Sequence, residues 1–91
     1  MDRTTFETWL KAGGYGEAMH RRMEAGQTAP DHAHPFDARL LVLEGEFVLE
    51  HNGNTRRYGP GEAFEVPANE PHGESFGPEG ATYLVGRRAA A

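Results

Sequence analysis

Three large apolar residues near the start of the chain recur at helical spacing, i, i+3 and i+4: Phe6, Trp9 and Leu10. On a helix these positions form one apolar stripe. The segment Thr4–Glu7 resembles a capping box, and Gly13-Gly14 can adopt the left-handed conformation that ends many helices. We therefore predict a short helix over residues 5–12, whose stripe packs on the rest of the domain or on a second subunit.

Beyond this helix the pattern changes to short apolar runs separated by turn residues. The runs predict strands over residues 15–24, 40–43, 47–50, 63–66 and 81–85. Tight turns are predicted at Glu44-Gly45-Glu46 and Asn52-Gly53, and a frayed C-terminus at residues 87–91. Strands that recur about every 8–12 residues are typical of an all-β sandwich or barrel. The sequence thus predicts a helical segment, 1–14, attached to a single barrel domain, 15–91.

Composition limits the chemistry that the chain can carry. Its 91 residues suffice for one small domain, and the absence of cysteine excludes disulfides, thiolate nucleophiles and cysteine-bound metals. Fourteen acidic and nine basic residues give a net charge of −5, which argues against nucleic acid or an anionic membrane as a partner. No apolar run approaches the roughly 18 residues of a membrane-spanning helix, and the start lacks a secretory-signal pattern. We therefore expect a soluble, cytoplasmic protein.

Histidines provide the main candidate chemistry. His32 and His34 are two positions apart, so on an extended strand both imidazoles face the same side and can approach one metal ion. Prolines bracket this pair and stiffen it. His72 follows a second proline-containing corner, 67–71. Each of these patterns taken alone is a weak indication of a metal site.

Together the segments resemble the two motifs that characterise the cupin superfamily. The first motif runs glycine, five residues, His-x-His, three or four residues, glutamate, six residues, glycine; the chain has Gly26, His32-Ala33-His34, Ala38 and Gly45. The second runs glycine, five residues, proline, one residue, glycine, two residues, histidine, three residues, asparagine; the chain has Gly61, Pro67, Asn69, His72 and Phe76. The similarity covers roughly residues 20–86.

The resemblance implies a small cupin (jelly-roll) β-barrel in which motif side chains hold a divalent metal ion. Carried over position by position, the metal ligands are His32, His34 and His72. The metal would be Fe, Mn, Ni, Cu or Zn. Cupins frequently pair through a sheet edge, so the resemblance also implies a homodimer.

The chain departs from the first motif where the ligand glutamate would stand, because Ala38 occupies that position. Asp37 should face away from the site, since consecutive strand residues point to opposite faces unless a bulge intervenes. Glu74, two residues after His72, could supply a carboxylate or a general base, but we predict a solvated side chain there. Two interpretations stay open: a three-histidine metal site, or a degenerate site that binds a small ligand without metal.

The other candidates are predicted to be structural. Leu40 and Val42 share the strand parity of Ala38 and should form an apolar wall on the same side. We expect Phe64 and Phe76 in the core. Four more side chains are expected at the surface: His20, Arg39, His51 and Arg56.

Two functions from different classes follow. Three neutral imidazoles leave the full charge of the metal and an open coordination position, which favours an anionic small-molecule ligand. The first function is therefore a metal-dependent dioxygenase, isomerase or lyase acting on a small organic acid or carbonyl compound. The alternative is a non-catalytic sensor or small-ligand-binding cupin without metal. Metal analysis of the purified protein distinguishes them.

Overall fold

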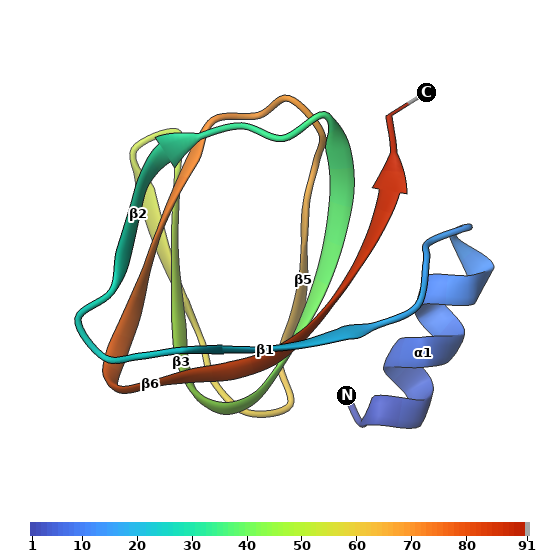
Figure 1. The fold of residues 1–91 in the computed structure, drawn as a ribbon, viewed down its shortest axis with the longest axis horizontal. Helices are drawn as coiled ribbons and strands as arrows, with labels where there is room; N and C mark the ends of the chain where they lie inside the picture. Colours follow the sequence, from blue (N-terminus) through green and yellow to red (C-terminus); the bar gives the residue numbers. More distant parts are fainter. Residues whose placement is uncertain (91) are drawn as a thin grey trace.

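The computed structural model describes residues 1–90, and this part of the chain contains one helix and six strands (Figure 1). Helix α1 spans Arg3–Ala12. The strands are β1 (Met19–Met23), β2 (Thr28–His32), β3 (Phe36–His51), β4 (Asn54–Tyr58), β5 (Ala63–Val66) and β6 (His72–Ala89). Every strand pair is antiparallel. The predicted all-β fold with one short N-terminal helix is confirmed.

Strands β3 and β6 are long and bent, and each contributes to both layers of the barrel (Figure 1). Residues 81–89 of β6 pair with residues 36–45 of β3, and β1 and β5 extend this layer on either side. Residues 72–76 of β6 pair with residues 47–50 of β3, and β2 and β4 extend that layer. The two layers face each other and enclose an interior, which is a jelly-roll arrangement.

Gly45 and Gly80 form the bend at which both long strands pass between layers. Their φ angles are 77° and 74°, in the region that glycine occupies without strain. A Cβ on Gly45 would lie 2.1 Å from the carbonyl oxygen of Gly80, so no side chain fits there. The turn predicted around Gly45 is therefore wrong: segments 40–43 and 47–50 belong to one strand, β3, whose register shifts at the bend.

Helix α1 starts two residues earlier than predicted and has a different cap. The Oδ1 atom of Asp2 accepts a hydrogen bond from the amide of Thr5 at 2.8 Å, which makes Asp2 the N-cap. These hydrogen bonds with Thr5 lower the pKa of Asp2. The capping box predicted at Thr4–Glu7 is thus wrong. The helix is too short and too polar to cross a membrane, and residues 1–90 contain no other.

The helix packs on the outer face of the layer that contains β1 and β5. Phe6 and Leu10 are buried there against Leu41 and Leu84. The apolar stripe of α1 therefore serves the core of its own chain.

Two arginines on the strands also form hydrogen bonds with backbone carbonyls at the C-terminal end of α1. Arg39 donates to the carbonyl oxygen of Trp9 at 2.7 Å, and its guanidinium lies 4.1 Å from the centroid of the Trp9 ring. Arg88 donates to the carbonyl oxygen of Gly13 at 2.7 Å. Arg39 was expected at the surface, but its side chain is only 14% exposed. The carbonyl oxygen of Trp9 also accepts from the amide of Gly13 at 3.2 Å, so Arg39 adds a second donor at the helix end.

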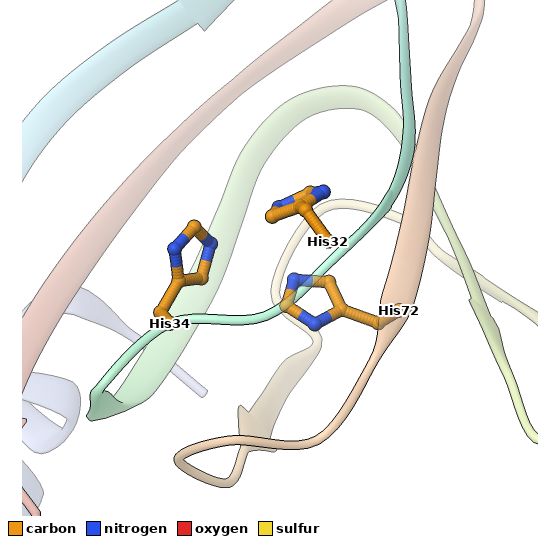
Figure 2. A group of neighbouring side chains, drawn as sticks. All are labelled: His32, His34 and His72. Carbon is orange, nitrogen blue, oxygen red and sulfur yellow. The ribbon is translucent and has the colours of Figure 1, made fainter.

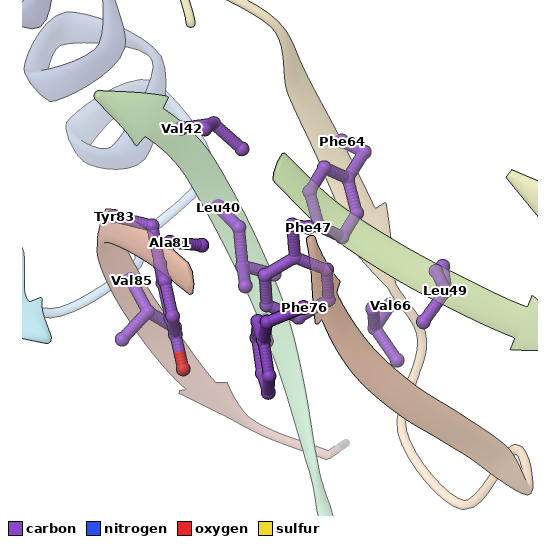
Figure 3. Close-up of a cluster of buried hydrophobic side chains, with 11 residues drawn as sticks. Leu40, Val42, Phe47, Leu49, Phe64, Val66, Phe76, Ala81, Tyr83 and Val85 are labelled. Carbon is purple, nitrogen blue, oxygen red and sulfur yellow. The ribbon is translucent and has the colours of Figure 1, made fainter. Parts of the chain in front are cut away.

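Aromatic and aliphatic side chains fill much of the barrel interior (Figure 3). Phe47 lies at the centre, edge-on to Phe76 and Tyr83 with ring centroids 5.1 Å away in both cases. Phe64 and Phe76 are buried in this cluster, as predicted, and so is Val42. Part of the same cluster forms the apolar side of the cavity that holds the histidines.

Candidate metal centre

The three histidines predicted as metal ligands converge inside the barrel (Figure 2). His32 on β2 and His72 on β6 are cross-strand partners, so their imidazoles face the same side. His34 lies two residues further, on the segment that connects β2 to β3. One ring nitrogen from each histidine lies within 4.8 Å of the other two. The structure therefore brings together all three candidate ligands.

The loop between β5 and β6 is attached to the His32–His34 segment through the backbone. The amide of Asn69 donates to the carbonyl oxygen of His34 at 2.7 Å. Asn69 stands where the second cupin motif has glycine, and its φ of 63° lies in the left-handed region, which asparagine tolerates better than most residues. This departure from the motif thus keeps the loop geometry that delivers His72 next to His34.

Backbone carbonyls orient two of the three rings. The Nδ1 atom of His32 is 2.8 Å from the carbonyl oxygen of Pro30, and that of His72 is 3.0 Å from the carbonyl oxygen of Glu70. Since a carbonyl oxygen only accepts, Nδ1 carries a hydrogen in both rings, which leaves Nε2 as the ring atom that faces a metal ion. Metal-binding histidines are commonly fixed by such a hydrogen bond from the other ring nitrogen.

The surroundings of His34 favour the neutral form of its ring. The pKa of His34 is lowered, chiefly because burial disfavours its charged form and then because of the positive charge that His32 and His72 can carry. A histidine has to be neutral to bind a metal ion. The donor set, three imidazoles with two rings pre-oriented, therefore fits a divalent transition metal.

The histidines line a cavity of about 200 Å³. Its apolar lining includes Ala38, Leu40, Val66 and Val85, and its other polar lining residues are Arg21, Glu74, Tyr83 and Arg87. Ala38, at the position of the missing glutamate, contributes only a methyl group. The apolar wall predicted from strand parity is confirmed for Leu40, whereas Val42 lies deeper in the core.

Two carboxylates near the site have different environments. Asp37 faces outward as predicted: Oδ2 accepts from Arg88 and Oδ1 accepts from the amide of Ala68, both at 2.8 Å. The hydrogen bond from Arg88, and then that from Ala68, lowers the pKa of Asp37. Glu74 faces the cavity, with a side chain 19% exposed and Oε1 3.9 Å from Nε2 of His72. The solvated side chain predicted for Glu74 is therefore wrong.

Sequence reasoning missed Arg87, which belongs to the cavity. The predicted frayed end is wrong for residues 87–89, because β6 continues to Ala89, while Ala91 lies outside the described residues. Tyr83, Val85 and Arg87 occupy every second position of β6 and all line the cavity. The same alternation would have predicted Arg87 there if the predicted strand, 81–85, had continued to residue 87. The guanidinium of Arg87 lies 4.6 Å from the centroid of the Phe36 ring.

Tyr83 and Arg21 were also missed. They are cross-strand partners on β6 and β1, and both line the cavity. The pKa of Tyr83 is raised, chiefly by burial and then by the negative charge of Glu74. A pKa above its usual value keeps the phenol protonated at neutral pH, so Tyr83 can donate a hydrogen bond into the cavity.

The remaining histidines and Arg56 lie away from the cavity. His20 and Arg56 are exposed, as predicted. His51 was expected at the surface; it is half-buried, and its Nε2 atom lies 2.7 Å from Oε2 of Glu70. This contact places His51 beside the loop that precedes His72.

Comparison with known proteins agrees with this geometry. Residues 19–84 match the family described as Cupin domain, and the chain therefore belongs to the cupin family. No curated protein sequence matches the chain significantly.

Among solved structures, the chain is similar to DMSP lyase DddQ from Ruegeria pomeroyi DSS-3, with 32% identity and a TM-score of 0.71. That match covers 79% of this chain but 37% of the lyase, so this chain spans little more than a third of the lyase's length. KdgF from Halomonas sp. is 27% identical over 80% of this chain and 68% of its own, with a TM-score of 0.65. An RmlC-like cupin from Shewanella frigidimarina NCIMB 400 is 27% identical over 80% of this chain and 65% of its own, with a TM-score of 0.69. The homodimer and the cytoplasmic location stay predictions from the sequence.

Proposed function

We propose that the protein is a metal-dependent enzyme that binds a divalent ion through His32, His34 and His72 and acts on a small anionic organic compound. The observation that carries this proposal is the convergence of three imidazoles on one cavity wall, two of them oriented through Nδ1. The similarity to a lyase of known structure favours lyase chemistry over the oxygenase and isomerase reactions that the sequence left open.

The positive charge of two arginines in the cavity supports an anionic substrate. Arg21 and Arg87 line it, and within residues 1–90 neither has a carboxylate oxygen within 4.0 Å. A guanidinium is well suited to bind a carboxylate through two parallel hydrogen bonds. The cavity volume of about 200 Å³ is below the ~300–1,000 Å³ of pockets for drug-sized ligands, which favours a small substrate.

Each part of the lining would have a distinct role. When bound, a divalent ion supplies a Lewis acid that polarises an oxygen atom of the substrate. Arg21 and Arg87 would hold the substrate's carboxylate, and the protonated phenol of Tyr83 would donate a hydrogen bond to a substrate oxygen. Leu40 and Val85 would exclude water from the carbon skeleton.

Metal analysis tests the proposal directly. The protein is purified without chelator, its metal content is measured by mass spectrometry, and the metal-free form is titrated with Zn²⁺, Mn²⁺, Fe²⁺, Ni²⁺ and Cu²⁺. We expect about one ion per chain, and we expect His72→Ala to weaken binding at least about 100-fold, since lost orienting partners alone cost about 10–100-fold. His20→Ala, which removes an exposed histidine outside the cavity, is the matched control.

Circular dichroism of both variants verifies that the fold is retained. A wild-type protein that is isolated empty and also binds none of the added ions would overturn the proposal. That result would favour the metal-free ligand-binding function instead.

A further inference from the structure

The ring of His72 is oriented by the loop that precedes it. His72 projects from the start of β6, directly after loop 67–71, which contains no helix or strand (Figure 2). Its Nδ1 atom lies 3.0 Å from the backbone carbonyl oxygen of Glu70. Pro71 follows Glu70 and restricts its backbone to extended conformations. The direction of this carbonyl, and with it the orientation of the His72 ring, therefore depends on how Glu70 is held.

The side chain of Glu70 is held from outside the barrel, by His51. The Nε2 atom of His51 lies 2.7 Å from Oε2 of Glu70, and Glu70 forms no other ion pair within residues 1–90. A ring nitrogen so close to a carboxylate oxygen is attracted to it only when the nitrogen carries a hydrogen. The two side chains are 35% and 45% exposed, and neither residue lines the cavity of the histidines.

His51 stands on a well-defined support, the hairpin of β3 and β4. It is the last residue of β3 and pairs with Asn54, the first residue of β4, across a two-residue turn. Asn52 and Gly53 in this turn have φ angles of 52° and 78°, and positive φ at both positions is typical of a type I′ hairpin turn. The hairpin thus fixes the position of His51, and contact with His51 restricts the irregular loop 67–71.

We propose that His51 is a positioning residue of the metal centre: it holds Glu70 in the place from which its carbonyl oxygen orients His72. The contacts run from the ring of His51 to the carboxylate of Glu70, and from the backbone of Glu70 to the ring of His72. A hydrogen bond to the second ring nitrogen of a metal-binding histidine orients the ring and raises its affinity for the metal. The inference rests on the proposed metal centre, and it adds a residue that lies outside the barrel.

The test compares His51→Ala with two matched variants. His20→Ala removes an exposed histidine outside the cavity. His51→Gln is the conservative variant, because its amide keeps an N–H donor at about the reach of Nε2. For each variant we measure the affinity for Co²⁺, the d–d absorption of bound Co²⁺, and the urea midpoint of the metal-free protein.

We expect His51→Ala to weaken Co²⁺ binding about threefold to tenfold and to change the d–d spectrum. This loss is smaller than the roughly 10–100-fold that removal of a ligand's direct partner costs, because His51 acts through Glu70. The urea midpoint should stay the same, since an exposed ion pair contributes little to overall stability. His51→Gln should restore the affinity and the spectrum, and His20→Ala should match the wild type.

Glu70→Ala tests the same contact from the other side, because it removes the carboxylate and keeps the backbone carbonyl. It should weaken binding as much as His51→Ala does, and the double variant should bind no more weakly than either single one. Losses that multiply in the double variant would show that the two residues act independently, which contradicts the proposal.

Two further outcomes separate this role from the metal centre itself. If His51→Ala keeps the wild-type affinity and spectrum while His72→Ala loses both, the metal centre stands and His51 does not position it. A wild-type protein that binds none of the divalent ions overturns the metal centre, and with it the role of His51.

Discussion

The layer that contains β1 and β5 has arginines on both faces, but only those on the outer face form ion pairs with carboxylates in residues 1–90. On the outer face, Arg39 binds Glu65 at 2.6 Å and Arg88 binds Asp37 at 2.8 Å, and both arginines also hold carbonyls at the end of α1. On the inner face, Arg21 and Arg87 have no such partner within residues 1–90. The outer arginines therefore have partners within the fold, whereas the inner ones have no carboxylate partner in residues 1–90.

Aromatic contacts reinforce this difference. The guanidinium of Arg39 lies between the rings of Trp9 and Tyr15, at 4.1 Å and 4.4 Å from their centroids, and Arg88 lies 4.6 Å from Tyr15. Arg87 contacts the single ring of Phe36 and remains exposed. Charged groups without a carboxylate partner, gathered in a cavity with three histidines, are what a binding site for a charged ligand needs.

The largest expected effect is on the outer face, where removal of Phe6 would detach α1. Phe6 is 0% exposed, and Phe→Ala in a core typically costs about 3–5 kcal/mol because the removed atoms leave a cavity. We expect Phe6→Ala to lower the free energy of unfolding by about that amount in urea denaturation. Met19→Ala, at an exposed position on β1, should change it by less than about 0.5 kcal/mol. Equal effects of the two variants would show that the helix adds no stability.

A smaller effect distinguishes the arginines of the two faces. Arg39→Ala loses hydrogen bonds and two ring contacts, so we expect it to destabilise the fold by about 1–3 kcal/mol. Arg87→Ala should cost less than about 0.5 kcal/mol, because Arg87 is exposed and unpaired. On the metal-loaded protein, however, Arg87→Ala should weaken binding of malonate, a small dicarboxylate, measured by calorimetry.

The opposite pattern would contradict the distinction between the faces. If Arg87→Ala destabilised the fold as much as Arg39→Ala and left malonate binding unchanged, Arg87 would be a structural residue. Thermal unfolding with and without malonate separates these two outcomes in one experiment.

The sequence predicted those parts of the molecule that depend on local pattern. The helical stripe of Phe6 and Leu10, the inward parity of Leu40 and the grouping of His32 with His34 all follow from periods of 3.6 or 2 residues. The outward direction of Asp37 follows from the same parity. These features need no knowledge of which strands are neighbours.

The errors concern features that depend on contacts between distant segments. Gly45 appears within a turn-like sequence, but its conformation is set by the carbonyl of Gly80, 35 residues away in the sequence. Arg87 resembles part of a disordered end, yet pairing with Ala38 of β3 keeps it in β6. Glu74 resembles a solvated residue until the facing strands enclose it. Such contacts are not encoded in any short window of sequence.

The smallest expected effect concerns Asp37, the carboxylate that Arg88 binds on the outer face. Because the folded protein lowers the pKa of Asp37 below the value of about 3.9 in an unfolded chain, the unfolded state binds more protons as the solution is acidified. The stability that Asp37 contributes is therefore fully present above the unfolded pKa and is lost as pH falls through the folded pKa. We measure the free energy of unfolding by urea denaturation between pH 6 and pH 3. The wild type should be more stable than Asp37→Asn at pH 6, and the difference between them should shrink as the pH falls toward 3.

Asp31→Asn is the matched control, because Asp31 is exposed and makes no ion pair within residues 1–90. A gap between wild type and Asp37→Asn that does not depend on pH would contradict the assigned role of the Arg88 contact. The same variant also sharpens the comparison of the two faces. Asp37→Asn should leave metal affinity unchanged, whereas His72→Ala should abolish it, because the three histidines lie on the inner face and Asp37 is bound by Arg88 on the outer one.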